Sequence, residues 1–180
     1  TWAFVLGKFL TDPIWWFFLF WLPSYFSDTY AIDLRKPNWQ LVAVYMATSL
    51  GSIGGGYLSS YLISKGWGVF RARKTSMLVF ALCVLPVMTA PWVGNIWTAV
   101  ALISLAAASH QAWSATIFTT ASDIFPKSSI STVVGIGGMA GSVGGILFPL
   151  LVGWLLDYYK SAGHIGTGYT ILFLISGSAY

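Results

Sequence analysis

The feature that most constrains this chain is a series of long apolar segments that contain few charges. They cover about residues 9–27, 41–63, 75–93, 97–121 and 132–154, and a sixth runs from 168 to 180. Each of the first five approaches or exceeds the roughly 20 residues that cross a hydrocarbon core as a helix. Charged residues make up 8% of the chain, against roughly 25% in soluble proteins. The sequence therefore predicts an all-α membrane protein.

The connections between these segments predict one domain. Most are short, and no linker-like or low-complexity stretch divides residues 1–180, so we expect a single six-helix bundle. The chain does not begin with Met, and the last apolar segment is cut off at Tyr180. We therefore interpret the chain as an internal fragment whose last helix is truncated.

The basic residues between the segments predict an orientation in the membrane. If the first span runs from inside to outside, the cytoplasmic side receives Lys8, Lys65, Arg71, Arg73, Lys74 and Lys127, and the outside receives Arg35, Lys36 and Lys160. Positive charge is enriched on the cytoplasmic side of membrane proteins, which favours this orientation. The same placement accounts for the net charge of +4 without a nucleic-acid partner.

Small residues recur every four positions in two spans. One stripe consists of Ala47, Gly51, Gly55 and Ser59, and the other of Gly137, Gly141 and Gly145. In lipid, helices associate through close van der Waals contact, so such stripes predict tight helix crossings. Either the stripes serve packing alone, or the helices also slide along them during a transport cycle.

Four of the prolines in the spans bear on the shape of their helices. Pro13 favours a helix start or a break directly after Asp12. Pro86, Pro91 and Pro149 each remove a backbone hydrogen bond, and we expect them to bend their spans.

Polar groups at membrane depth are the best indicators of function, because each is costly there unless it faces a cavity or a partner. The fourth span places His110 and Gln111 near its middle, with Trp113 and Ser114 about one turn onward. Amide and imidazole groups exchange hydrogen bonds with sugar hydroxyls, and an indole face packs on a sugar ring. The alternative is that these groups form interhelical hydrogen bonds that hold the bundle together. A lone His is weak support for a proton carrier.

The first span begins with a charged pair before an aromatic run. Lys8 and Asp12 are spaced i,i+4, so they can pair on one helix face. Asp12 serves either an inner gate or structural ion pair, or it handles the ligand or a proton directly. Trp15 and Trp16 lie about one turn deeper, where they wall a cavity or pack against lipid or a neighbouring helix. Lys8 and Asp12 stand at the inner end of the span, and no Lys or Arg is expected at the middle of the membrane.

Enzymatic motifs are not found in the sequence. It contains no phosphate-binding glycine loop with Lys and Ser/Thr, and no His/Cys cluster with metal spacing. Cys83 has no sequence partner for a disulfide or a metal. Ser114 and His110 are one turn apart, as a nucleophile and a base could be, but nothing else supports hydrolysis. We expect neither enzymatic activity nor a cofactor or metal.

Several motifs resemble those of a known family. The loop "GGYLSSYLISKGWGVFRARK" resembles the loop between the second and third helices of each half of major facilitator superfamily transporters. The stretches "FLTDPIWWFFLFWLPSYF", "AASHQAWSA", "SDIFPK" and "VVGIGGMAGSVGGILFPLLVG" look like the anion:cation symporter branch, and most like bacterial hexuronate transporters. The resemblance covers essentially all 180 residues as helices seven to twelve, the C-terminal half of a twelve-helix transporter.

The resemblance implies a proton-coupled symporter of the bacterial inner membrane that imports hexuronates such as glucuronate and galacturonate. Its partners would be the small anionic sugar, protons, the lipid bilayer and the N-terminal half of the same transporter. The first and fourth spans would line the cavity, which agrees with Trp16, Gln111 and Trp113. The carboxylate-binding arginine and the proton-coupling acids are expected in the N-terminal half, so this half would contact the sugar hydroxyls.

The resemblance also implies an inner gate. Gly56 and the cluster Arg71, Arg73 and Lys74 match the family loop, whereas Ser60 stands where an acid is often found. Asp123 lies in the loop after the fourth span, where it either braces the gate or is a solvated turn residue. Two other classes of function remain: a transporter of aldonates, aromatic acids or organic phosphates, and a membrane sensor that transports nothing.

Overall fold

The computed structural model describes all 180 residues, and its regular structure is entirely helical. In chain order the elements are α1 (Trp2–Phe20), α2 (Leu22–Tyr30), α3 (Trp39–Ser64), α4 (Val69–Val84), the 3₁₀ helix η1 (Leu85–Trp92), α5 (Ile96–Ile124), α6 (Lys127–Ser161) and α7 (Ile165–Ser178). The predicted all-α class is confirmed. The first span consists of α1 and α2 together, and the third of α4 and η1.

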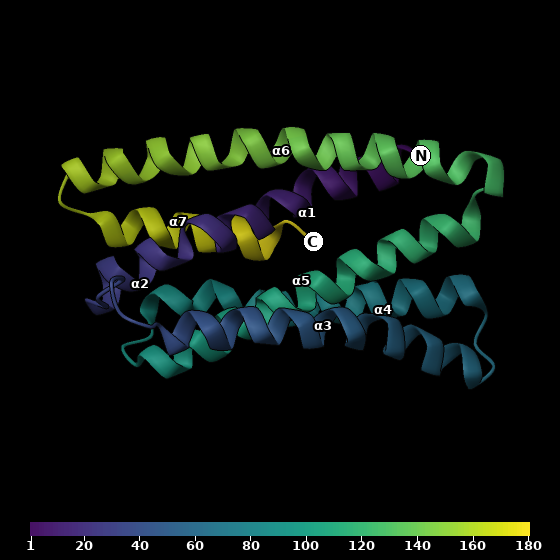
Figure 1. The fold of residues 1–180 in the computed structure, drawn as a ribbon, viewed down its shortest axis with the longest axis horizontal. Helices are drawn as coiled ribbons and strands as arrows, with labels where there is room; N and C mark the ends of the chain where they lie inside the picture. Colours follow the sequence, from purple (N-terminus) through teal and green to yellow (C-terminus); the bar gives the residue numbers. More distant parts are fainter.

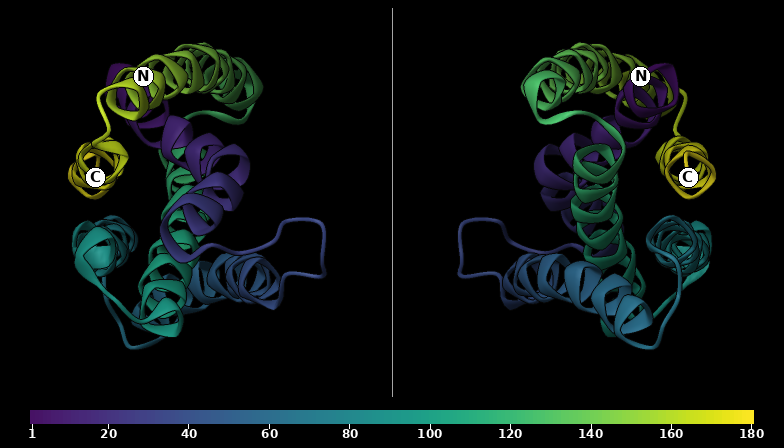
Figure 2. Two further views of the ribbon diagram at one scale, coloured as in Figure 1. Left: turned by 90° about the vertical axis from the view of Figure 1, so that its left-hand side faces the viewer. Right: turned by 90° about the vertical axis from the view of Figure 1, so that its right-hand side faces the viewer.

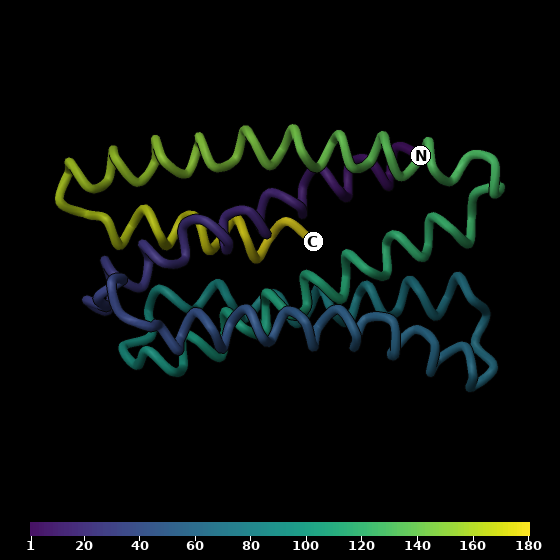
Figure 3. The backbone as a smooth tube through the Cα atoms, in the orientation of Figure 1, coloured from purple at the N-terminus to yellow at the C-terminus, as the bar shows by residue number.

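Helix α5 runs diagonally through the centre of the bundle. It crosses between α6, α1 and α7 on one side and α3 and α4 on the other (Figures 1 and 2). Along the chain, α1 packs on α6, and α5 packs on both α3 and α4. The α3–α4 and α5–α6 connections lie at one end, and the α2–α3, η1–α5 and α6–α7 connections at the other (Figure 3). The two groups of loops that the sequence assigns to opposite membrane sides are therefore at opposite ends.

Four helical stretches are long and apolar enough to cross a membrane: Trp2–Phe20, Trp39–Ser64, Val69–Trp92 and Lys127–Ser161. Helix α5 has 29 residues but is not among them, although the sequence predicts a span there. His110 and Gln111 in its middle lower its hydropathy. A central helix that packs against its neighbours on several sides needs a less apolar surface than one that faces lipid. The composition of α5 therefore reflects its position inside the bundle.

Pro13 acts differently from expectation. Pro13 lies inside α1, so the predicted start or break at Asp12 is wrong. A Cβ at Gly144 of α6 would overlap the Pro13 ring and the Phe9 carbonyl oxygen, which shows how closely α6 covers this turn. Proline is tolerated in membrane helices where a neighbouring helix shields the freed backbone groups. The break comes at Trp21, just before Pro23 in the first turn of α2.

The other prolines divide into two cases. Pro86 and Pro91 lie in η1, where the third span changes from α-helical to 3₁₀ geometry. This change agrees with the predicted disturbance of that span, because a proline cannot supply the N–H that an α-helix requires. Pro149 lies inside α6, and the helix continues through it.

An aromatic core holds α1, α2, η1 and α7 together at the end opposite the α3–α4 loop. Tyr25 packs edge-on against Phe173 at 4.9 Å and against Tyr169 at 5.0 Å between ring centroids. The Tyr25 hydroxyl donates to the Ala90 carbonyl oxygen at 3.1 Å, and the Tyr169 hydroxyl donates to Asp28 at 2.7 Å. Each buried ring thus has its polar end satisfied, as buried tyrosines require.

The glycine stripes form tight crossings, as predicted. Gly51 and Gly55 of α3 lie against the backbone of Ala108 and Ala112 of α5, and an added Cβ would overlap that backbone. The second stripe lies against α1, where Gly137, Gly141 and Gly145 meet the side chains of Phe4, Asp12 and Trp16. These two contacts fix α5 on α3 and α6 on α1.

The α3–α5 crossing generates the first prediction. In Gly55→Ala the new methyl group would lie 2.5 Å from the Ala112 carbonyl oxygen, so the two backbones must separate. We expect a loss of about 1–3 kcal/mol in the free energy of unfolding, as for other overpacked interiors. The midpoint of thermal unfolding of the purified full-length protein measures it.

Gly56→Ala is the matched control, because no atom lies within 4 Å of a Cβ at that neighbouring position. It should leave the midpoint unchanged or raise it slightly, since Ala favours helix by about 1 kcal/mol over Gly. Equal midpoints for the two variants would contradict the tight crossing.

Candidate functional site

A buried ion pair links α1 to α5. Lys8 is 4% exposed, and its Nζ lies 2.7 Å from Oδ1 of Asp12, one turn further along α1. The same Nζ donates to Ser114 Oγ on α5 at 3.3 Å and lies 4.3 Å from the centroid of the Phe118 ring. The ammonium group is therefore held by a carboxylate, a hydroxyl and an aromatic face.

The position of Lys8 bears on one expectation. The sequence places Lys8 at the inner end of its span and predicts no cation at the middle of the membrane. In the structure Lys8 is buried between α1 and α5, and its partner Ser114 is ten residues, about 15 Å, from the end of α5 at Ile124. This half therefore contains a cation buried inside the bundle.

Asp12 fits into space that a glycine leaves free. A Cβ at Gly141 of α6 would overlap Oδ2 of Asp12, so the carboxylate occupies the place of a side chain there. The Asp12 side chain is 19% exposed, compared with 5% for Lys8. Asp12 is thus the more accessible member of the pair. An isolated buried charge is strongly destabilising, which explains why the two charges are found together.

His110 is enclosed by aromatic side chains. It is 2% exposed, its Nδ1 is hydrogen-bonded to the hydroxyl of Tyr180, and Trp15 is stacked on its ring at 6.0 Å with a 5° interplanar angle. The hydroxyl of Ser114 is occupied by Lys8. His110 and Ser114 are therefore not arranged as a base and a nucleophile, although their spacing in the sequence would allow it.

Gln111 and Trp113 point to different sides of α5. Positions two residues apart on a helix are separated by about 200° around its axis. Trp113 is 8% exposed, belongs to a buried cluster with Phe4 and Ile117, and meets the Tyr180 ring edge-on at 5.6 Å. Gln111 is partly exposed and lies three residues before Ser114, a spacing that places two residues on neighbouring parts of one helix face. The two residues therefore do not share one face of α5.

The two tryptophans of α1 also separate. Trp15 lies toward α5, over His110. Trp16 lies toward α6, where its indole nitrogen fills the space beside Gly145, and it is stacked on Phe20 at 5.6 Å. Both are partly exposed. We call Lys8, Asp12 and Ser114, together with Gln111 one turn before Ser114 on α5, the α1–α5 polar seam.

The largest cavity is not at this seam. It has a volume of about 380 Å³ and lies on another side of α1, between α6 and α7, lined mainly by apolar residues that include Phe9, Leu10, Leu147 and Leu151. No charged side chain lines it. A polar, anionic ligand would find few partners there, because binding sites need convergent polar groups for orientation. The chemistry favours the polar seam over the largest cavity.

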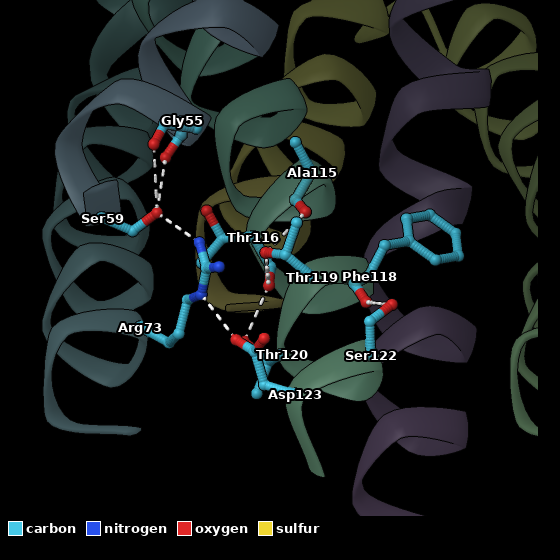
Figure 4. Close-up of polar contacts among 11 residues, drawn as sticks. Gly55, Ser59, Arg73, Ala115, Thr116, Phe118, Thr119, Thr120, Ser122 and Asp123 are labelled. Carbon is cyan, nitrogen blue, oxygen red and sulfur yellow. Dashed lines mark hydrogen bonds and ion pairs between the residues drawn. The ribbon is translucent and has the colours of Figure 1, made fainter. Parts of the chain in front are cut away.

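A second ion pair closes the end of the bundle near the α3–α4 loop. Figure 4 shows the Arg73 guanidinium between α3 and α5. Arg73 donates through Nε to Asp123 at 3.0 Å and through Nη1 to Ser59 Oγ at 2.6 Å. Arg73 of α4 thus connects α3 and α5. Ser60, at the position expected for the family acid, is exposed, and Asp123 supplies the carboxylate from another helix.

The rest of the predicted basic cluster is not part of this connection. Arg71 is exposed and lies over the Trp67 ring, 4.7 Å from its centroid. Lys74 is also exposed. Of the three basic residues predicted for the gate, the structure brings only Arg73 to Asp123.

Sequence reasoning missed three contributors to these contacts. Ser59 was recognised as part of a small-residue stripe, but not as the acceptor for Arg73. Gly141 was likewise recognised for packing, whereas it also makes room for the Asp12 carboxylate. Tyr180 gave no signal, since its contact with His110 joins residues 70 positions apart.

The three-helix contact of Arg73 generates the second prediction. In Arg73→Gln the charge is lost, so Asp123 and Ser59 lose their common partner. We expect the free energy of unfolding to fall by about 1 kcal/mol, a modest value because Asp123 is partly exposed and water screens the pair. Arg71→Gln, with an exposed side chain, should stay within about 0.5 kcal/mol. Thermal unfolding of the full-length protein compares them, and an equal effect would refute the special position of Arg73.

Comparisons with known proteins give the family of the chain. The model of the Major Facilitator Superfamily matches residues 1–149. The chain is 31% identical over 160 residues to a hexuronate transporter of Escherichia coli (strain K12), covering 87% of this chain and 36% of that protein. It is 29% identical over 157 residues to a D-galactonate transporter of Escherichia coli O6:H1, with the same coverage.

A probable galactarate/D-glucarate transporter of Escherichia coli (strain K12) is 27% identical over 155 residues, covering 86% of this chain and 35% of that protein. The chain therefore spans little more than a third of the length of these curated relatives. The family match covers most of the chain, and the helices are those of a membrane bundle. The chain belongs to the Major Facilitator Superfamily.

Proposed function

We propose that this chain is the C-terminal half of a proton-coupled symporter that imports hexuronates, such as glucuronate and galacturonate, across the bacterial inner membrane by alternating access. The observation that carries the proposal is the α1–α5 polar seam, a set of polar groups held between α1 and the central helix α5. The relatives named above, described as carriers of hexuronate, galactonate and glucarate, support a sugar acid as the substrate. The N-terminal half would complete the site from the facing side.

Within this half, the residues have distinct proposed roles. Gln111 would exchange hydrogen bonds with sugar hydroxyls, since an amide both donates and accepts. Trp15 and Trp16 would flank the sugar ring, because indole faces pack on apolar ring surfaces. His110 and Trp113 are buried and would support this surface from behind.

At the inner end, Arg73, Asp123 and Ser59 would brace a gate. Their contacts join α3, α4 and α5, so the three helix ends would move together as the transporter changes between its two open states. Arg71 and Lys74 would face the cytoplasmic surface, where basic residues favour retention on that side.

One alternative has its own support. The similarity to a D-galactonate transporter is almost as high as that to a hexuronate transporter, 29% against 31% identity over similar lengths. An aldonate has the same carboxylate and several of the same hydroxyls. The substrate would then be an aldonate, carried by the same site.

Uptake by the full-length protein in proteoliposomes gives the third prediction. Labelled glucuronate should accumulate only with an inward proton gradient, and unlabelled galactonate should compete weakly. Gln111→Ala should raise the KM for glucuronate roughly tenfold, because losing hydrogen bonds worth about 1.4 kcal/mol changes affinity by that factor. Gln40→Ala, which changes the same side chain at the start of α3, should leave the KM unchanged.

Each outcome has a different meaning. Accumulation of galactonate alone would mean that the substrate is an aldonate and not a hexuronate. An unchanged KM in Gln111→Ala would remove Gln111 from the site. The absence of gradient-driven uptake of either sugar acid by the wild type would refute the proposed function. Uptake of another organic anion would then indicate a different transporter, and no uptake across a wider panel of solutes would favour a sensor.

A further inference from the structure

We propose that Lys8 binds the carboxylate of the substrate and that Asp12 is the group that a proton must neutralise before this can happen. The inference rests on the proposed function, because it requires an anionic substrate and a coupled proton. It places a carboxylate subsite in this half of the transporter, whereas the resemblance implies one in the N-terminal half, and it gives Asp12 the proton-handling role that the sequence left open.

The first argument is the position of the pair. The five acidic residues of the chain are Asp12, Asp28, Asp33, Asp123 and Asp157. Four of them lie in loops or in the terminal turns of helices, at Asp28, Asp33, Asp123 and Asp157. Asp12 alone lies away from the end of its helix, and it is paired with the buried Lys8. Ionisable residues inside a membrane bundle are costly and mark substrate or ion pathways.

The second argument is the geometry around the ammonium group. Lys8 has three N–H donors. One reaches Asp12 at 2.7 Å and one reaches Ser114 at 3.3 Å, and the Phe118 ring lies on another side. The carboxylate of Asp12 is more exposed than the Lys8 side chain, so it occupies the accessible position on the ammonium group. A substrate carboxylate would need this position.

The third argument is electrostatic. Two ionised carboxylates that share one site repel each other, and the neutral form of one of them is then favoured. Protonation of Asp12 therefore weakens the ion pair between Asp12 and Lys8. The carboxylate of the substrate can then bind to Lys8. The proton adds to a carboxylate oxygen of Asp12, and the ion pair passes from Asp12 to the substrate. The net charge at Lys8 stays the same, so no unpaired charge is left inside the bundle.

The neighbouring helices place no other carboxylate beside Lys8, so Asp12 is the group that takes up the proton. Helix α5 presents Ser114 and Phe118 to Lys8, and its nearest titratable group, His110, is bonded to Tyr180 and covered by Trp15. Helix α6 presents Gly141, which has no side chain. Asp12 is thus the carboxylate in contact with Lys8, and the exchange needs only the two charged residues of α1.

The test uses the full-length transporter in proteoliposomes, with labelled glucuronate as the probe. Counterflow exchange measures binding and translocation without a gradient, and accumulation with an inward proton gradient measures coupling. The decisive variant is the double neutral one, Lys8→Met with Asp12→Asn, because it leaves no unpaired charge. The control is Asp33→Asn with Lys36→Met, an exposed pair of the same chemistry in the outer loop.

If the substrate carboxylate replaces Asp12 on Lys8, the double variant should fold, but its rate of glucuronate counterflow should fall at least tenfold. The rate of Lys8→Met alone should fall as much. Asp12→Asn should lose gradient-driven accumulation, and its remaining counterflow should no longer depend on pH. In the wild type, the affinity for glucuronate should rise as the pH falls, since the substrate binds when Asp12 is protonated. The control pair should behave as the wild type.

A purely structural ion pair predicts the opposite result. The double variant would then recover counterflow and accumulation that each single variant loses, and such recovery would overturn the proposal. A wild-type affinity for glucuronate that does not change with pH would also overturn it, whether or not any variant folds. Failure of the proposed function is a separate outcome, because it would appear as absent uptake in the wild type.

Discussion

Close backbone contact between helices is the constraint on which this structure depends. In lipid there is no gain from hiding apolar side chains from water, so helices associate through van der Waals contact and through the few polar groups they share. The contacts of Gly51 and Gly55 with α5, and of Gly141 and Gly145 with α1, bring the helices near enough for short polar side chains to meet. The Asp12 carboxylate, for example, occupies the space that Gly141 of α6 leaves free.

The same constraint explains why polar residues gather on α5. Its neighbours α3 and α6 carry exposed apolar side chains along much of their length, such as Met46, Ile53 and Leu150, and these suit a lipid-facing surface. Helix α5 lies between the two sides of the bundle. It can therefore carry His110, Gln111 and Ser114 at a depth where a lipid-facing helix could not without a large desolvation cost.

Patterns within one helix were predictable from the sequence, and contacts between helices mostly were not. The all-α class follows from apolar length, and the tight crossings follow from the four-residue glycine period. The i,i+4 spacing of Lys8 and Asp12 indicated their pairing. By contrast, the hydrogen bond of Lys8 to Ser114 joins two helices, which the spacing of residues within α1 does not reveal. The side of α5 on which Trp113 lies depends on Phe4 and Tyr180, which are distant in the sequence.

The continuity of α5 has a mechanical consequence. Unlike α1 and α6, it contains no proline, so it is a stiff rod from Ile96 to Ile124. Asp123, the partner of Arg73, and Ser114, the partner of Lys8, are nine residues apart on that rod, about 14 Å along its axis. A tilt of α5 that draws Asp123 away from Arg73 must also displace Ser114 relative to Lys8. The Arg73–Asp123 contact and the Lys8–Ser114 contact are thus coupled mechanically through one rigid helix.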